Sequence, residues 1–151
     1  MKDIKVAILG YGTVGKGVFQ IINQTPNMEV VKILENPEKF DKDCISLFTS
    51  DIDLIVNDPN IDVVVEVLGG YGFARGCIDK AINAGKHVVT ANKEIIALDI
   101  DTLTLKARDK NVCLAYEASV GGGIPIIKNL KEIKEVSHIS KISGILNGTT
   151  N

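Results

Sequence analysis

The chain has 151 residues, 45% of them apolar, and a formal net charge of −2. This length suffices for one domain with a real core, and the absence of a basic run argues against nucleic acid or an anionic membrane surface as a partner. No signal peptide and no apolar stretch of the roughly 20 residues that span a membrane can be recognised, and the three cysteines form no C-x-x-C pair, so we expect a cytoplasmic protein.

The first half of the chain predicts two strands separated by a helix. Residues 4–9 are apolar and β-branched and are followed by a glycine, as in a buried strand. Residues 14–24 have apolar side chains at helical spacing, and a second strand is predicted over 29–34. Next, residues 46–49 fit a short strand, whereas 52–57 fit either a helix or a strand.

In the second half, strand and helix patterns continue to alternate. Strands are predicted over 61–68, 87–90, 112–116 and 139–146, and helices over 71–84, 98–108 and 125–133. Strands that alternate with helices predict right-handed βαβ units. We therefore expect an α/β fold of the Rossmann type, doubly wound, with a mostly parallel sheet and helices on both faces.

A glycine motif, G-Y-G-T-V-G, lies between the first predicted strand and the first predicted helix. Gly10 permits a tight turn, Gly12 lets a pyrophosphate approach the backbone, and Gly15 allows close packing of helix on strand. The start of the helix supplies free N–H groups and a partial positive charge. Glu35 follows the second strand roughly 20 residues on, where an acidic residue binds the ribose hydroxyls. This context predicts dinucleotide binding; the alternative is a structural turn without a ligand.

Four further segments accompany this motif. They are E-V-L-G-G at 66–70, T-A-N-K at 90–93, E-A-S-V-G-G-G-I-P at 117–125 and G-I-L-N-G-T-T-N at 144–151. With the glycine motif, in order and spacing, they resemble the homoserine dehydrogenase family over essentially the whole chain. The resemblance implies the interconversion of L-homoserine and L-aspartate 4-semialdehyde with NAD(P)(H), in the biosynthesis of threonine, methionine and isoleucine, by an enzyme that is usually a homodimer.

The resemblance also implies a division of the chain. Residues 1–135 match the dinucleotide-binding domain of the family, and 136–151 match the start of a dimerisation and substrate region that is truncated here. The G-Y-A-E-A-D-P segment of the family, and the later aspartate and lysine that bind homoserine and relay its proton, have no counterpart. We therefore expect the chain alone to bind the cofactor with little or no turnover.

By resemblance, several residues receive roles at the cofactor. Gly12, Thr13 and Val14 line its phosphates, in agreement with the open N–H groups at a helix start, and Gly69 borders it. Lys93 matches a lysine near the nicotinamide and the substrate, where an ammonium stabilises the negative charge that develops on the substrate oxygen. A solvated surface lysine is the alternative for Lys93.

A cation site is implied by the third of those segments. In the family this loop holds a monovalent cation, usually sodium, and the corresponding ligands are the carboxylate of Glu117 and the carbonyl groups of Val120, Gly122 and Ile124. Hard oxygen ligands suit such an ion. The alternative is an ordinary turn with Glu117 near a helix start.

The choice between NAD and NADP depends on the residue after the second strand. Many family members carry an arginine there, which binds the 2′-phosphate of NADP, but this chain has Glu35. A carboxylate binds ribose hydroxyls and repels a phosphate, so the sequence predicts a preference for NAD(H). Lys32 and Lys39 lie near Glu35 in the sequence, and the alternative is that these cations bind the 2′-phosphate of NADP.

The sequence leaves two alternative functions and the role of one residue undecided. The chain is alternatively a free-standing dinucleotide sensor or regulatory module without catalysis, or a dehydrogenase for another aspartate-like substrate. Glu66, late in a predicted strand, either faces the ribose or nicotinamide or accepts a hydrogen bond from a neighbouring backbone N–H.

Overall fold

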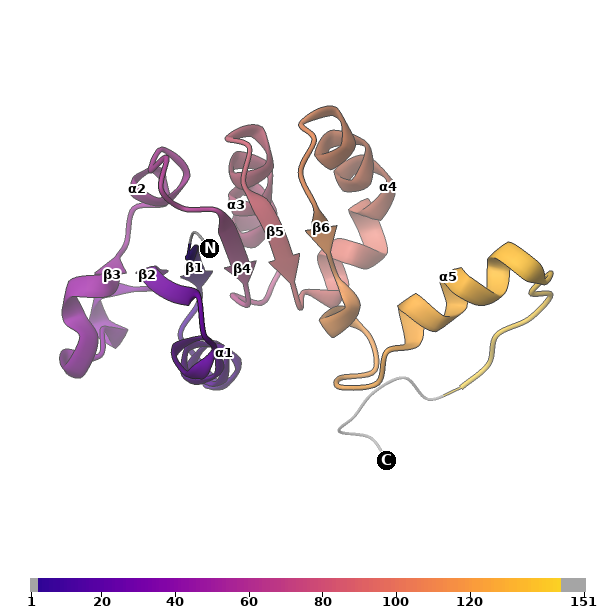
Figure 1. Cartoon of the computed structure of the whole chain (residues 1–151), viewed down its shortest axis with the longest axis horizontal. Helices are drawn as coiled ribbons and strands as arrows, with labels where there is room; N and C mark the ends of the chain where they lie inside the picture. Colours follow the sequence, from indigo (N-terminus) through magenta and orange to yellow (C-terminus); the bar gives the residue numbers. More distant parts are fainter. Residues whose placement is uncertain (1–2, 145–151) are drawn as a thin grey trace.

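The computed structural model describes residues 3–144, and its centre is a six-stranded sheet (Figure 1). The strands are β1 (Ile4–Leu9), β2 (Met28–Leu34), β3 (Phe48–Thr49), β4 (Val63–Glu66), β5 (His87–Thr90) and β6 (Leu114–Ala115). The α-helices are α1 (Thr13–Gln24), α2 (Asp53–Val56), α3 (Gly72–Asn83), α4 (Lys93–Asp109) and α5 (Ile126–Val136), and short 3₁₀ helices are η1 (Pro37–Lys39), η2 (Lys42–Leu47) and η3 (Glu117–Ser119).

All strands of the sheet are parallel, in the order β3-β2-β1-β4-β5-β6. The chain lays down strands on one side of β1 and then returns to its other side, so the order reverses between β1 and β4. This arrangement confirms the predicted doubly wound fold. In such sheets ligands bind beyond the carboxyl ends of the strands, at the point of reversal.

The central strand, β1, is buried on both faces. Val6, Ala7, Ile8 and Leu9 have no exposed surface, and alternate side chains along them belong to two different apolar clusters. Strand side chains point alternately to opposite faces, so each cluster fills one side of the sheet. This two-sided burial explains why the segment is a continuous apolar run in the sequence.

Helices cover both clusters. Ile78 of α3 and Leu103 of α4 pack in the cluster that contains Ala7 and Leu9. Ile22 of α1 packs in the other, with Val6 and Ile8. In Figure 1, accordingly, α3 and α4 lie on one side of the strands and α1 on the other. No helix in the described part of the chain is long and apolar enough to cross a membrane.

The turn between β1 and α1 leaves no room for side chains at two of its glycines. Gly10 has φ of +101°, and a Cβ there would lie 2.9 Å from the carbonyl oxygen of Val67. A Cβ at Gly15 would overlap the carbonyl oxygen of Gly10. The N–H of Gly10 also donates to the carbonyl of Leu34 at 2.9 Å. The turn therefore has the tight geometry that the glycine spacing predicts.

The largest difference in helix bounds concerns α4. The apolar spacing predicts a start at residue 98, whereas the helix begins at Lys93. The reason is a cap: the side chain of Asn92 accepts a hydrogen bond from the N–H of Ile95 at 3.2 Å. Asparagine is among the best residues at this position because it satisfies a donor that the helix itself leaves open.

The strand predicted over 139–146 is wrong as far as the structure describes it. Residues 138–144 form neither helix nor strand, and residues 145 and 146 lie outside the described residues, as does most of the G-I-L-N-G-T-T-N segment. A strand requires a neighbour for its N–H and C=O groups. The described sheet ends at β6, and α5 leads the chain away from it (Figure 1).

We predict opposite effects for two alanine substitutions in α1. Gly15→Ala lowers the free energy of unfolding by about 1–3 kcal/mol, because its methyl group overlaps the Gly10 carbonyl. Gly17→Ala raises it by about 0.5–1 kcal/mol, because a Cβ there meets nothing within 4 Å and alanine favours the helix. Urea unfolding followed by far-UV circular dichroism measures both, and equal effects of the two substitutions would contradict the close approach.

Candidate functional site

The carboxyl edge of the sheet carries an open helix start. Gly12 is the N-cap of α1 and offers no side chain to the first N–H groups, and no acidic residue lies in the first turn. Gly12, Thr13 and Val14 are exposed, whereas Gly10 and Gly15 are buried. The first N–H groups of a helix have no carbonyl partner within the helix and carry partial positive charge, so this end is suited to bind an anion such as a phosphate.

Glu35 is fixed against this turn. Its carboxylate accepts a hydrogen bond from the N–H of Tyr11 at 2.8 Å and a second from the N–H of Asn36 at 2.9 Å. Both of its oxygens are therefore held at the end of β2, beside the glycine turn. The Glu35 side chain borders a cavity of about 280 Å³. The other residues that border this cavity are Leu34, Asn36, Ser50, Leu68 and Phe73.

Tyr11 anchors the turn through its ring. The ring packs edge-on against Phe19 and Phe48, with centroids 5.7 and 5.1 Å away. Burial raises the pKa of Tyr11 to about 12, and the Cys44 thiol, 3.9 Å from the hydroxyl, adds to the rise. The phenol thus stays neutral at ordinary pH, which suits its place in an apolar cluster.

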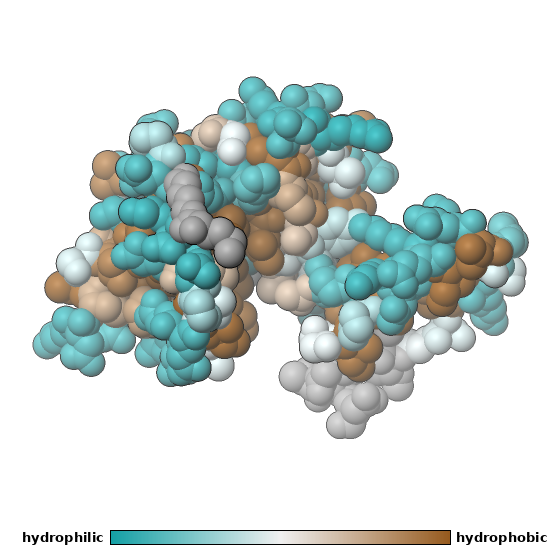
Figure 2. Space-filling model, in the orientation of Figure 1, coloured by the Kyte–Doolittle hydropathy of each residue, from teal (hydrophilic) through white to brown (hydrophobic). Residues whose placement is uncertain are grey.

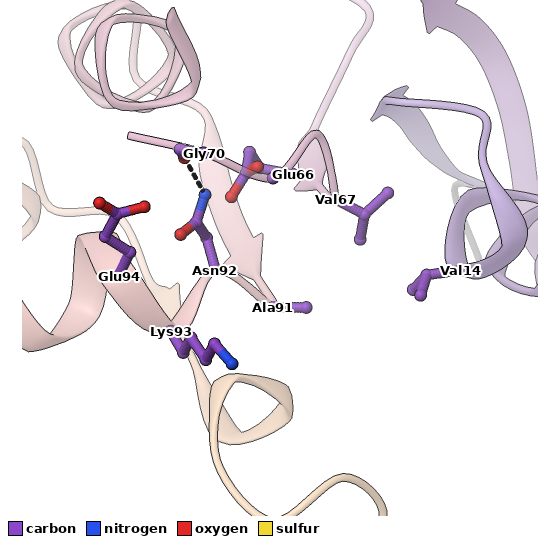
Figure 3. A pocket seen from close by; sticks show the side chains of 9 residues that line it. Val14, Glu66, Val67, Gly70, Ala91, Asn92, Lys93 and Glu94 are labelled. Carbon is purple, nitrogen blue, oxygen red and sulfur yellow. Dashed lines mark hydrogen bonds between the residues drawn. The ribbon is translucent and has the colours of Figure 1, made fainter. Parts of the chain in front are cut away.

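A different cavity at this edge, of about 260 Å³, lies on the β4–β5 side of the glycine turn, and we call it the main cavity because Lys93 borders it (Figure 3). Three segments border it. They are the start of α1 (Val14), the end of β4 and the following turn (Glu66, Val67, Gly69, Gly70), and the start of α4 (residues 91–94). The structure thus brings Val14, Gly69 and Lys93, three of the predicted cofactor residues, to one cavity, while Glu35 borders the other.

Lys93 is exposed at the first position of α4. In Figure 3 its amine lies at the edge of the open space that Ala91, Val67 and Val14 also border, while the side chain of Glu94 points to the other side. Within residues 3–144 no carboxylate forms an ion pair with it. An amine without a carboxylate partner among residues 3–144 therefore borders the cavity.

Glu66 is completely buried at the end of β4. Its carboxylate accepts hydrogen bonds from the N–H of Leu68 at 2.9 Å and from the hydroxyl of Thr90 at 2.5 Å. Of the two roles left open by the sequence, the bond from a neighbouring backbone N–H is present in the structure. Glu66 also borders the main cavity.

Sequence reasoning assigned no individual role to Asn92. Its side-chain amide caps α4 and donates to the carbonyl oxygen of Gly70 at 2.6 Å. The cap was recognisable in the sequence, since an asparagine precedes Lys93 and Glu94. The bond to Gly70 was not, because it joins residues 22 positions apart on two different strand ends.

The candidate cation loop uses its carboxylate as a helix cap. Glu117 accepts hydrogen bonds from the N–H groups of Ile127 at 2.8 Å and Lys128 at 3.0 Å, at the start of α5. Gly121 and Gly122 have φ of +73° and +62°, so the chain curls between η3 and α5. Among the described residues, no three His, Cys, Asp or Glu side chains gather in a way that would hold a metal ion.

Comparison with known proteins connects this site to one family. Residues 10–117 match the family model described as "Homoserine dehydrogenase, NAD binding domain". Homoserine dehydrogenases of Pseudomonas aeruginosa and Bacillus subtilis are 43% and 38% identical to the whole chain, which spans 37% and 38% of their lengths.

Solved structures of homoserine dehydrogenases are also similar to this chain. A homoserine dehydrogenase from Thiobacillus denitrificans has a TM-score of 0.78 and 39% identity, over 87% of this chain and 33% of its own. The enzyme from S. aureus at pH 8.5 has a TM-score of 0.71 and 33% identity, over 81% of this chain and 34% of its own. These likenesses favour a dehydrogenase domain over a free-standing sensor. The chain belongs to the homoserine dehydrogenase family, and the part of the family that it contains is the NAD-binding domain.

Proposed function

We propose that this domain binds NAD(H), or less tightly NADP(H), for the interconversion of L-homoserine and L-aspartate 4-semialdehyde. The observation that carries the proposal is the open start of α1, at the reversal of strand order, beside a cavity that contains the Lys93 amine. Exposed N–H groups of Gly12, Thr13 and Val14 would bind the pyrophosphate, while Gly10 and Gly15 shape the turn around it.

The dinucleotide, when bound, supplies or accepts the hydride. Reduction of an aldehyde leaves negative charge on its oxygen, and the reverse reaction begins from a hydroxyl that must lose its proton. Lys93 would stabilise the charge on that oxygen, because its amine borders the cavity and has no carboxylate partner in the described part of the chain. Gly69 borders the same cavity and would lie against the cofactor.

Glu35 supports the proposed preference for NAD(H). Its carboxylate cannot turn away from the site without losing its bonds to the N–H groups of Tyr11 and Asn36. A carboxylate fixed at the end of the second strand accepts hydrogen bonds from ribose hydroxyls and repels a 2′-phosphate. Lys39 is exposed in η1 and Lys32 half-buried in β2, and these are the cations that would favour NADP(H) instead.

The same proposal includes a sodium ion and a domain boundary. In support of the ion, Glu117, Val120, Gly122 and Ile124 all lie between β6 and α5, where the positive φ angles of Gly121 and Gly122 curl the chain. We place the dinucleotide-binding domain at 1–135 and the start of the dimerisation and substrate region at 136–151. In support of this boundary, every strand within residues 3–144 comes before η3, and α5 has no buried residue.

A homodimer is the proposed assembly of the whole enzyme. Apolar side chains of α5 are exposed, among them Ile133 at 47% and Val136 at 85%, and brown, hydrophobic residues are visible on α5 in Figure 2. Apolar surface of this kind is commonly covered by a partner or a further domain.

A cofactor titration tests the role of Glu35. We expect this chain to bind NADH more tightly than NADPH. Glu35→Gln should reduce that ratio by roughly tenfold, because it removes a charge near the 2′-phosphate. The change in NADH fluorescence on binding is a clean signal, since the chain contains no tryptophan. Glu38→Gln, an exposed carboxylate in η1, is the matched control. Tighter binding of NADPH by the unmodified chain would refute the assignment.

A second experiment tests Lys93. The chain spans 37% of a curated relative, so we expect it to bind NADH without oxidising homoserine. In a dehydrogenase that joins this domain to a substrate domain, Lys93→Met should lower kcat roughly a hundredfold or more, because an ammonium that stabilises transition-state charge is lost. The affinity for NADH should change little. Robust turnover by the 151-residue chain, or an unchanged kcat in Lys93→Met, would count against the proposed roles.

A further inference from the structure

Three buried polar residues at the main cavity have no role in the proposed chemistry: Glu66 and Asn92 border the cavity, and Thr90 is hydrogen-bonded to both of them. Glu66 and Thr90 have no exposed surface, and Asn92 is 7% exposed. They come from the ends of two neighbouring parallel strands, β4 and β5, and from the cap of α4. A buried polar group destabilises a fold unless it is hydrogen-bonded, so three together require an explanation.

The three residues are joined by consecutive hydrogen bonds. One carboxylate oxygen of Glu66 accepts from the N–H of Leu68, and the other accepts from the hydroxyl of Thr90. The hydroxyl oxygen of Thr90 in turn accepts from the N–H of Asn92 at 3.0 Å. The carboxylate thus connects the backbone after β4 with the backbone after β5.

Asn92 closes the connection with its amide group. The amide nitrogen donates to the carbonyl oxygen of Gly70 and the amide oxygen accepts from the N–H of Ile95. The reverse orientation would set N–H against N–H and oxygen against oxygen, so the two bonds fix the amide in one direction. The dashed line in Figure 3 marks the bond to Gly70, which crosses from the turn after β4 to the start of α4.

The network restrains a segment that the backbone alone would leave loose. Gly69 and Gly70 have φ of +75° and +69°, and no atom lies within 4 Å of where a Cβ would stand on either. Two such glycines in sequence have many accessible conformations. The bond from Asn92 fixes the carbonyl of Gly70, and the residue after Asn92 is Lys93. The Asn92 amide thus fixes the position of the glycine turn and also caps the helix that carries Lys93.

The position of the network indicates which part of a dinucleotide it serves. A dinucleotide crosses the sheet at the reversal of strand order, with its pyrophosphate at the start of α1. Glu35, proposed for the adenosine ribose, lies at the end of β2, on one side of this point. The network lies on the other side, at the ends of β4 and β5, where the nicotinamide half would lie.

We propose that Asn92, with Thr90 and Glu66, positions the nicotinamide half of the bound dinucleotide. The three residues do so by fixing the position of the Gly69–Gly70 turn relative to Lys93. These are positioning residues, because they act through the turn and the lysine. The inference rests on the proposed cofactor binding, and it adds that different residues position the nicotinamide half and the adenosine half. The adenosine half is independent of this network.

The variant Asn92→Asp separates the two bonds of the amide. An aspartate is an equally good N-cap and still accepts from the N–H of Ile95, but it has no donor for the carbonyl of Gly70. We expect it to bind NADH about tenfold more weakly, as for the loss of one buried hydrogen bond. The added negative charge should weaken the binding of NADH and of ADP-ribose, which lacks the nicotinamide, to the same extent. Apart from this shared effect, the affinity for ADP-ribose should change by less than about twofold. NADH and ADP-ribose carry the same pyrophosphate charge and both riboses, so the ratio of the two affinities isolates the contribution of the nicotinamide ring.

Thr90→Val is a second, uncharged variant of similar shape that removes the hydroxyl bridge, and it should lower the same ratio. Asn83→Asp, exposed at the far end of α3, introduces the same charge change away from the cavity and should leave the ratio unchanged. Thermal melting by circular dichroism confirms that each variant is folded. Equal losses for NADH and ADP-ribose in Asn92→Asp, or no loss, would overturn the inference. If the unmodified chain binds neither ligand, the proposed function fails first, and the inference falls with it.

Discussion

The close approach of α1 to the end of β1 is the constraint on which this site depends. Gly10 turns the chain in a conformation that side chains rarely adopt, and Gly15 lets the helix pack against the Gly10 carbonyl. The first N–H groups of α1 are thereby aimed along the carboxyl edge, where the strand order reverses. A larger residue at either position would move the helix start away from the edge, where Val14 borders the main cavity.

Two carboxylates at strand ends flank this turn, and each fixes a backbone segment. Glu35, at the end of β2, accepts from the N–H of Tyr11 within the turn. Glu66, at the end of β4, accepts from the N–H of Leu68 and from Thr90. A carboxylate that accepts more than one hydrogen bond is held firmly, because charge-assisted bonds are stronger than neutral ones. The edge is therefore rigid on both sides of the helix start, which limits the conformational entropy that a ligand must remove on binding.

Much of the fold could be predicted because its determinants are local. The apolar run of β1, the helical spacing of α1 and α3, and the glycine turn are all short patterns whose physical meaning does not depend on distant residues. The predicted start of α4 is too late because apolar spacing does not reveal the cap at Asn92, which begins the helix at Lys93. The strand predicted over 139–146 is absent from the described residues 139–144, because a strand depends on a neighbour, which no local pattern supplies. For the same reason, the contact of Asn92 with Gly70 and the capping of α5 by Glu117 could not be derived from the sequence.

The most direct test of the account is a map of backbone amide chemical shifts during titration with NADH. The pyrophosphate is proposed to bind at the start of α1, because that helix end is exposed, has no side-chain cap and has no acidic residue in its first turn. The largest changes should therefore occur at the N–H groups of Gly12, Thr13 and Val14, with further changes at Gly69 and Lys93. Saturable binding that leaves the amides of residues 12–14 unchanged would contradict it, since the dinucleotide would then bind elsewhere on the domain.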